Sequence, residues 1–144
     1  MSPELVHVAA AIGWAYAHEP ALSVTLPLHL ENATNEHAHW RARQKRAKAQ
    51  RTVVALGLGG KLRGLRCGTE RLVVLVTRIA PCRLDDDGAV AAAKTVRDQV
   101  ARLLFGGRIG AQDSHERVTW LPVDQERAGV REYACRVEVW RWER

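Results

Sequence analysis

The chain has 144 residues, 47% of them hydrophobic, which suits a single domain with an ordinary core. Its 22 Lys and Arg residues outnumber 16 Asp and Glu residues, and the formal net charge of +6 favours an anionic partner. Three widely spaced cysteines and the lack of any Lys or Arg before Arg41 argue against a disulfide-rich secreted protein with a signal peptide. We therefore expect a soluble cytoplasmic protein that does not enter the membrane.

The N-terminal segment has the pattern of a helix. Ser2 is a typical N-cap, Pro3 suits the first helical position, and an Ala-rich run then extends to about His18. On this basis we divide the chain into an N-terminal helical extension, residues 1–20, and a main domain, residues 21–144.

A strand and a second helix are expected next. Residues 22–30 alternate apolar and polar side chains, which predicts a strand, and Pro27 favours a place at the edge of a sheet. After a polar loop, residues 40–56 are rich in helix formers, and the glycines that follow predict the end of the helix. The expected apolar face of this helix consists of Ala42, Ala49, Val53 and Leu56.

The second helix lies in a strongly basic region. Between His37 and Thr69 there are nine Lys and Arg residues and no Asp or Glu. A helix face of this kind would neutralise several phosphates without reading base sequence. The alternative is an ordinary solvated helix face, although such faces usually mix both signs. The candidate DNA contacts on this helix are Arg41, Arg43, Lys45, Lys48 and Arg51.

The rest of the chain predicts an α+β fold. The β-branched run of residues 71–80 is typical of a buried strand, residues 89–104 have helical periodicity, and two closing strands are expected at residues 117–123 and 132–142. We therefore expect one mixed β-sheet packed against helices. Trp140 and its neighbours in the last strand are expected to pack in the core or in a dimer interface.

Three consecutive aspartates stand where the buried strand leads into the next helix. Asp85 and Asp87, as alternate residues, would converge on one point, and such concentrated charge is costly without a cation. Oxygen ligands select hard metals such as Mg²⁺ or Mn²⁺, which promote the attack of water on phosphodiesters. Asp113, beyond the helix, is a possible third ligand.

Simpler interpretations of these residues remain open. Asp86 or Asp87 would also serve as a helix cap that interacts with the helix dipole. Lys94 lies four residues before Asp98, so it forms either a surface ion pair with that residue or a contact to the scissile phosphate. His37 and His39 have no third ligand at a fixed spacing, so we interpret them as loop residues rather than a transition-metal site.

The run R-L-D-D-D-G-A-V-A-A-A-K-T-V-R-D, residues 83–98, resembles the signature of RusA-type Holliday junction resolvases. In that family, and above all in its phage and prophage members, D-x-D-N-L is followed by Lys and a K-x-V-R-D helix. Weaker matches occur in order along the chain, at residues 26–27, Asn35, Asp113, residues 118–120 and residues 133–139.

This resemblance implies a function and a set of site residues. Asp85, Asp87 and Asp113 correspond to the metal-binding aspartates of the family, Lys94 to its catalytic lysine, and Asn35 to a residue of the DNA-binding side. The family implies a RusA-like homodimer that cuts branched DNA symmetrically across a four-way junction with Mg²⁺. This chain has Gly88 where the motif has Asn, which removes a side-chain contact near the metal. A non-catalytic DNA-binding module with a degenerate nuclease site is therefore the competing hypothesis.

Overall fold

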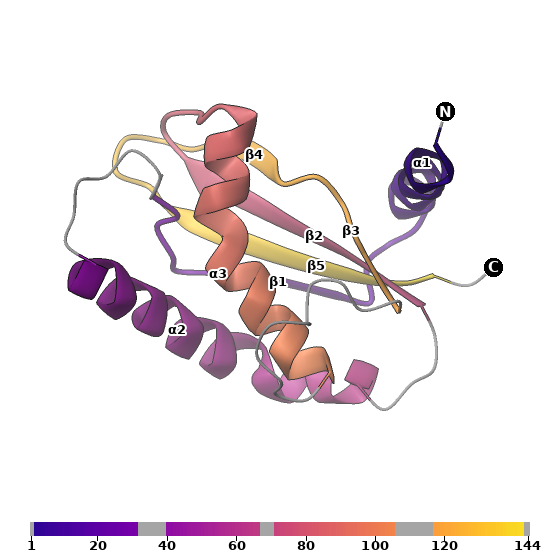
Figure 1. The fold of residues 1–144 in the computed structure, drawn as a ribbon, viewed down its shortest axis with the longest axis horizontal. Helices are drawn as coiled ribbons and strands as arrows, with labels where there is room; N and C mark the ends of the chain where they lie inside the picture. Colours follow the sequence, from indigo (N-terminus) through magenta and orange to yellow (C-terminus); the bar gives the residue numbers. More distant parts are fainter. Residues whose placement is uncertain (1, 32–39, 67–70, 106–116, 143–144) are drawn as a thin grey trace.

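The computed structural model describes residues 2–31, 40–66, 71–105 and 117–142. They form a mixed β-sheet with two helices on one face and one helix on the other, so the α+β expectation is confirmed (Figure 1). No helix among these residues is long and apolar enough to cross a membrane. The elements are α1 (Pro3–Ala17), β1 (Leu22–Leu26), α2 (Trp40–Arg66), β2 (Arg71–Ala80), α3 (Asp86–Phe105), β3 (Val118–Trp120), β4 (Asp124–Arg127) and β5 (Ala134–Trp142).

The sheet is built around β2. Its strand order is β1-β5-β2-β3, and β4 pairs with the same strand β2. The pairs β1–β5 and β5–β2 are antiparallel, whereas β3 and β4 run parallel to β2. The short strand β3 pairs with the first half of β2, and β4 pairs with its last residues from Thr77 to Ala80. The carboxyl end of β2, from which the chain leads into α3, is therefore bordered by β4.

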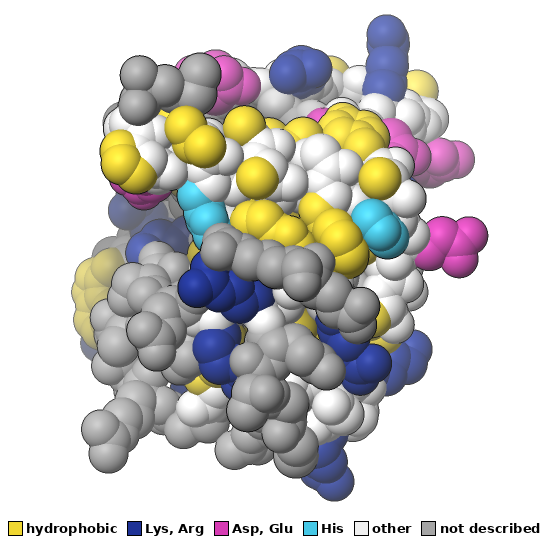
Figure 2. All heavy atoms as spheres, turned by 90° about the vertical axis from the view of Figure 1, so that its right-hand side faces the viewer, with side chains coloured by type: hydrophobic (Ala, Val, Ile, Leu, Met, Phe, Trp, Pro, Cys, Tyr) yellow, Lys and Arg dark blue, Asp and Glu magenta, His cyan; other side chains and the backbone are white. Residues whose placement is uncertain are grey.

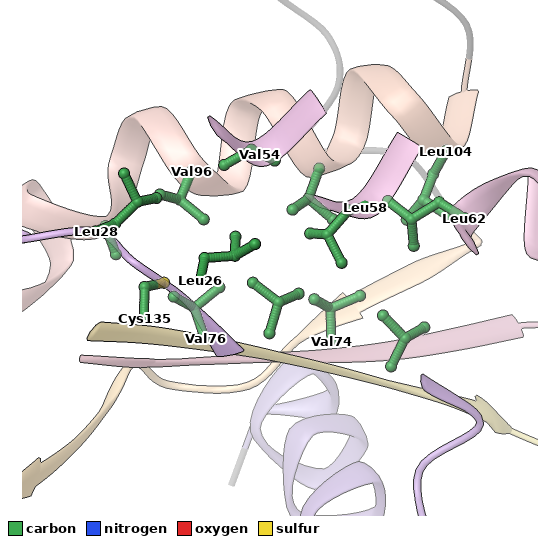
Figure 3. Packing of buried hydrophobic residues seen from close by; sticks show 14 of the residues in the cluster. Leu26, Leu28, Val54, Leu58, Leu62, Val74, Val76, Val96, Leu104 and Cys135 are labelled. Atoms are coloured by element: carbon green, nitrogen blue, oxygen red, sulfur yellow. The ribbon is translucent and has the colours of Figure 1, made fainter. Parts of the chain in front are cut away.

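Alternate residues of the central strands supply two separate apolar layers. Val74 and Val76 of β2 and Val137 of β5 lie in the core beneath α2 and α3, where they meet Val54 and Val96 (Figure 3). The opposite face of the sheet carries a smaller cluster that packs against α1. This second cluster consists of Ala11, Val73, Leu121, Trp140 and Trp142.

Helix α1 begins and ends as the sequence predicts and covers the second face of the sheet. The Ser2 hydroxyl accepts a hydrogen bond from the Leu5 amide at 3.3 Å, as an N-cap should. At the other end, the Trp140 indole N–H donates to the His18 carbonyl oxygen at 2.9 Å. The outer side of α1 carries exposed apolar residues, among them Leu5 and Tyr16, and Figure 2 shows hydrophobic side chains gathered on this side of the molecule.

Of the two places expected for Trp140, the core is confirmed and the dimer interface is wrong. Trp140 is only 5% exposed within a single chain, because α1 already covers it. Val137 and Val139 of the same strand both belong to the core beneath α2 and α3. Residues two apart in a strand share a face, so the strand has one aliphatic face and one tryptophan face.

Helix α2 is ten residues longer than predicted. It continues through the glycines to Arg66, and its buried positions recur every three or four residues. The expected apolar face is therefore wrong at three of its four positions: Leu56 is 83% exposed, and Ala42 and Ala49 are exposed as well, whereas Val53 is half-buried and packs against the core. Because the predicted helix ended at the glycines, its expected apolar face could not include the buried leucines that follow Gly57. The buried face consists of Gln50, Val54, Leu58, Leu62 and Leu65.

The glycines of α2 allow one sharp test of this packing. A Cβ atom at Gly57 would collide with the buried Leu26 side chain, whereas a Cβ atom at Gly60 would meet open space. We expect Gly57→Ala to lower the free energy of unfolding by about 1 kcal/mol, since overpacking outweighs the gain in helix propensity. Gly60→Ala should raise it by about 0.5–1 kcal/mol. Urea denaturation of both variants checks the opposite signs, and two changes of the same sign would contradict this packing.

The remaining differences concern the ends of elements. Strand β1 ends at Leu26 rather than near Leu30, although Leu28 and Leu30 are buried. The strand expected over residues 117–123 is confirmed only at residues 118–120, and β4 was not predicted at all. Helix α3 begins at Asp86, three residues earlier than expected. The third aspartate of the acidic run is therefore already helical.

Candidate metal and nucleic-acid site

Asp85 is the N-cap of α3. Its Oδ1 atom accepts a hydrogen bond from the Gly88 amide at 2.7 Å, and its carbonyl oxygen accepts from the Ala89 amide at 2.9 Å. The capping role that we considered for Asp86 or Asp87 thus belongs to Asp85. A cap occupies only one carboxylate oxygen, so the second oxygen of Asp85 is available to another ligand.

All three aspartates have exposed side chains at the first turn of α3. Because Asp86 and Asp87 are already helical, the alternation from which we expected Asp85 and Asp87 to converge does not apply. The unpaired amide groups and the dipole of a helix N-terminus partly stabilise this concentration of negative charge. The start of α3 is therefore an exposed acidic turn that we call the acidic junction, residues 85–87.

The acidic junction is fixed to the sheet by a side chain that the sequence did not indicate. Gln125 of β4 accepts a hydrogen bond from the Leu84 amide at 2.8 Å and donates one to the Leu84 carbonyl oxygen, also at 2.8 Å. This two-point contact holds the residue just before the acidic junction against the end of β2. The local sequence does not predict this role of Gln125, because the other three side chains of β4 are exposed and the strand has no alternation of apolar and polar residues.

Lys94 lies two turns into α3, on the same side as Asp87. Its side chain is 71% exposed, and its Nζ atom is 3.9 Å from Oδ2 of Asp98. The surface ion pair that we considered as the simpler interpretation is therefore present. Such pairs contribute only a few tenths of a kcal/mol on a helix, so this one would yield readily to a phosphate contact.

The basic half of α2 lies beside the same part of α3. Arg43 and Arg46 share a hollow with Ala91 and Thr95 of α3. Ala91 is one turn after Asp87, and Thr95 is the neighbour of Lys94 in sequence. The basic half of α2 thus lies beside the part of α3 that follows the acidic junction, and α2 and α3 pack directly on each other.

The predicted basic side chains differ in their surroundings. Arg41, Arg43, Lys45 and Lys48 are exposed, as predicted, whereas Arg51 is half-buried. A further arginine of this segment, Arg46, forms an ion pair with Glu31 at 3.0 Å, so part of its charge is already balanced.

Trp40 is a feature of this surface that the sequence analysis missed. It is the first residue of α2, its indole is exposed, and it lines a surface hollow together with Arg41, Lys45, Lys48 and Arg51. An exposed aromatic ring among cations is the usual arrangement for stacking on bases. The position of Trp40 at the start of a basic amphipathic helix is the signal in the sequence that could have indicated it.

The described residues contain only part of the expected metal site. Among them, no three His, Cys, Asp or Glu side chains are grouped so as to hold a metal ion. Asp113, the expected third ligand, and Asn35 lie outside the described residues, as do His37 and His39. The donors that are described, Asp85 and Asp87, are exposed carboxylates of the kind that hard cations such as Mg²⁺ or Mn²⁺ prefer.

A comparison with models of known protein families gives no match to this chain, and a search of curated proteins gives none either. The relation to RusA-type resolvases therefore rests on the motif of residues 83–98 and belongs to the proposed function.

Proposed function

We propose that this protein is a Mg²⁺-dependent endonuclease of the RusA type that cuts branched DNA at four-way junctions. The observation that carries the proposal is the place of the basic half of α2 beside α3: Arg43 and Arg46 share a hollow with Ala91 and Thr95, which follow Asp87 by one and two turns. Metal-dependent hydrolysis of a phosphodiester needs both kinds of charge close enough to contact one DNA molecule. The carboxylates bind the metal ion, and the Lys and Arg side chains bind the polyanionic DNA backbone.

Each group then has a distinct task. Asp85 and Asp87 would hold Mg²⁺, or Mn²⁺ in its place, with Asp113 as the third carboxylate. The ion, when bound, supplies charge stabilisation and a more acidic water. The bond from Gly88 to Asp85 fixes the orientation of one carboxylate before any ligand arrives. Lys94 would exchange its weak contact with Asp98 for an oxygen of the reacting phosphate.

In this proposal, helix α2 explains why the protein would select DNA by its branched shape rather than by its base sequence. Its exposed Lys and Arg side chains would contact phosphates, which are the same whatever the base sequence. Selectivity would then come from the arrangement of the DNA backbones at a junction. A four-way junction is resolved by cuts in two opposed strands. We therefore include in the proposal a homodimer with one active site per protomer, because a two-fold axis fixes two identical sites at one separation.

Replacing Arg41, Lys45 and Lys48 together by Ala should weaken junction binding and flatten its dependence on salt. Each lost phosphate contact removes about 0.9 units from the slope of log K against log salt, so the triple variant should lose roughly three units. Fluorescence anisotropy at several salt concentrations measures the slope. Lys61→Ala with Arg63→Ala, at the far end of the same helix, is the matched control, and an unchanged slope in the triple variant would move the DNA surface elsewhere.

The second candidate function is a DNA-binding module without catalysis. It is favoured by Gly88 in place of the motif's Asn and by the capping role of Asp85, which gives the acidic junction a structural task. A synthetic four-way junction incubated with the protein in Mg²⁺ separates the two. The nuclease should release nicked duplexes cut in opposed strands and should leave a linear duplex of the same sequence intact. Tight binding without any cleavage, in Mg²⁺ or Mn²⁺, would establish the module instead.

A further inference from the structure

Arg78 is a buried charge that has no carboxylate partner within the described part of the chain. It lies in β2 on the face that Val74 and Val76 turn toward α3, and it is only 5% exposed. Its Nε atom donates to the Leu30 carbonyl oxygen at 2.8 Å, and its Nη1 atom donates to the Cys82 carbonyl oxygen at 2.7 Å. Among the residues that the structure describes, no Asp or Glu forms an ion pair with it.

Such a group is costly in a folded protein. Two carbonyl oxygens satisfy hydrogen-bond donors but do not neutralise a charge, and a guanidinium group cannot shed its proton at neutral pH. Burial lowers the pKa of Arg78, the direction expected for a cation that has lost its water. Buried arginines usually have an anion beside them, so the lack of one beside Arg78 among the described residues is the unexplained feature.

A pocket opens directly onto this arginine. Its volume is about 320 Å³, at the lower end of the range for small-ligand sites. Two more arginines line it: Arg83, from the segment before the acidic junction, and Arg127, from the end of β4. Both are exposed, and neither forms an ion pair with any of the described residues.

The electrostatic balance of the pocket is positive. Among the lining residues that the structure describes, Glu126 is the one carboxylate, against the three arginines. That carboxylate already binds Arg136, whose Nη2 atom is 2.7 Å from Oε2 of Glu126. Three arginines thus line a space in which the one acidic side chain among the described lining residues forms an ion pair with a fourth arginine.

We propose that this pocket binds a phosphate group. Guanidinium groups present planar pairs of N–H donors that match the oxygens of phosphate, and a phosphate would balance the charge that Arg78 carries. The occupant would be either a phosphate of a nucleic-acid backbone or a free phosphate or phosphomonoester. The chemistry of recognition is the same for both.

The position of the pocket connects it with the proposed nuclease site. Arg83 is two residues before Asp85, and Gln125, another lining residue, holds Leu84 between them. The part of this inference that concerns DNA rests on the proposed function: the pocket would seat a backbone phosphate next to the phosphodiester that is hydrolysed at the acidic junction. The binding of a phosphate as such does not depend on it.

The test measures the binding of inorganic phosphate to the full chain by isothermal titration calorimetry, without Mg²⁺ and at constant ionic strength. Arg78 is buried and its variants risk unfolding, so the exposed Arg83→Gln and Arg127→Gln carry the test. Each should weaken phosphate binding about tenfold, the loss expected for one charge-assisted contact. Arg71→Gln removes an equal charge from the opposite end of β2 and should change nothing. No saturable binding by the unaltered chain, or equal binding by all three variants, would overturn the proposal.

A second arm identifies the source of the phosphate. If the pocket seats a DNA phosphate, inorganic phosphate should compete with a duplex oligonucleotide, and Arg83→Gln should weaken DNA binding as well. If DNA binding is unchanged while phosphate binding is lost, the pocket takes a free phosphate or a phosphomonoester. Asp85→Asn, measured in parallel, separates the two proposals, because it should leave phosphate binding intact whether or not the protein proves to be a nuclease.

Discussion

Asp85→Asn should reduce Mg²⁺-dependent cleavage of a four-way junction at least about 100-fold without unfolding α3. Loss of a charged metal ligand removes several kcal/mol of transition-state stabilisation, and each 1.4 kcal/mol corresponds to a factor of ten in rate. Asn is as good an N-cap as Asp, so its side-chain oxygen still accepts the bond from Gly88. Single-turnover cleavage rates and thermal denaturation of the same sample measure the two effects.

Two matched variants separate the catalytic task of Asp85 from its capping task. Asp85→Ala loses both, so it should be inactive and also less stable by about 0.5–2 kcal/mol. Asp86→Asn removes the same charge from the same turn without touching an expected ligand, and it should keep most of the activity. If Asp85→Asn cleaves like the unaltered chain, Asp85 is only a cap and the metal lies elsewhere.

Trp140→Ala should lower the free energy of unfolding by about 3–5 kcal/mol, the usual cost of emptying a large buried aromatic site. The indole packs between the sheet and α1, against Ala11 and Leu121, and it donates a hydrogen bond to the His18 carbonyl oxygen. The variant loses this contact and the fixed position of α1 together. Urea denaturation followed by circular dichroism measures the loss.

Tyr16→Ala provides the control for this experiment. Tyr16 is an aromatic residue of the same region but is almost fully exposed, so its removal should change stability by less than about 0.5 kcal/mol. A Trp140→Ala variant that keeps full stability but halves its mass in light scattering would restore the dimer-interface interpretation that the structure contradicts.

The elements with strong local signals were predictable. Strand β2 is a β-branched run with no competing pattern, and α1 has both a capping serine and a proline at its start. The apolar side of α3 was also predicted, since Ala89, Val96 and Leu104 are buried as its periodicity requires. In these segments the local preference and the tertiary burial agree, so the sequence pattern is sufficient.

Where tertiary packing overrides local preference, the sequence was misleading. Glycines normally weaken a helix, yet α2 passes through them because Leu58 and Leu62 bury their side chains beneath it and Gly57 permits a close approach to Leu26. Strand β4 has no alternation and exists because its backbone pairs with the end of β2. Neither cause can be read from a window of neighbouring residues.

The candidate site was predictable in its charges but not in its geometry. The acidic junction and the cationic side of α2 were visible in the sequence, but the place of Arg43 and Arg46 beside Ala91 and Thr95 of α3 depends on how α2 and α3 pack. The cap at Asp85 follows from where α3 begins, which the sequence placed three residues too late. Arg78 is a further signal in the sequence, since a charged residue inside an otherwise apolar buried strand requires a partner.

The most direct test of the nuclease proposal is the digestion of a supercoiled plasmid that extrudes a cruciform, because the two strands of one junction must then be cut in a single complex. With Mg²⁺ the unaltered chain should convert supercoiled plasmid directly to the linear form, with little nicked circle at any time, and Asp85→Asn should leave it supercoiled. If the plasmid remains supercoiled with the unaltered chain, in Mg²⁺ and in Mn²⁺, under conditions where the chain binds the cruciform, this protein is not a junction-cutting nuclease.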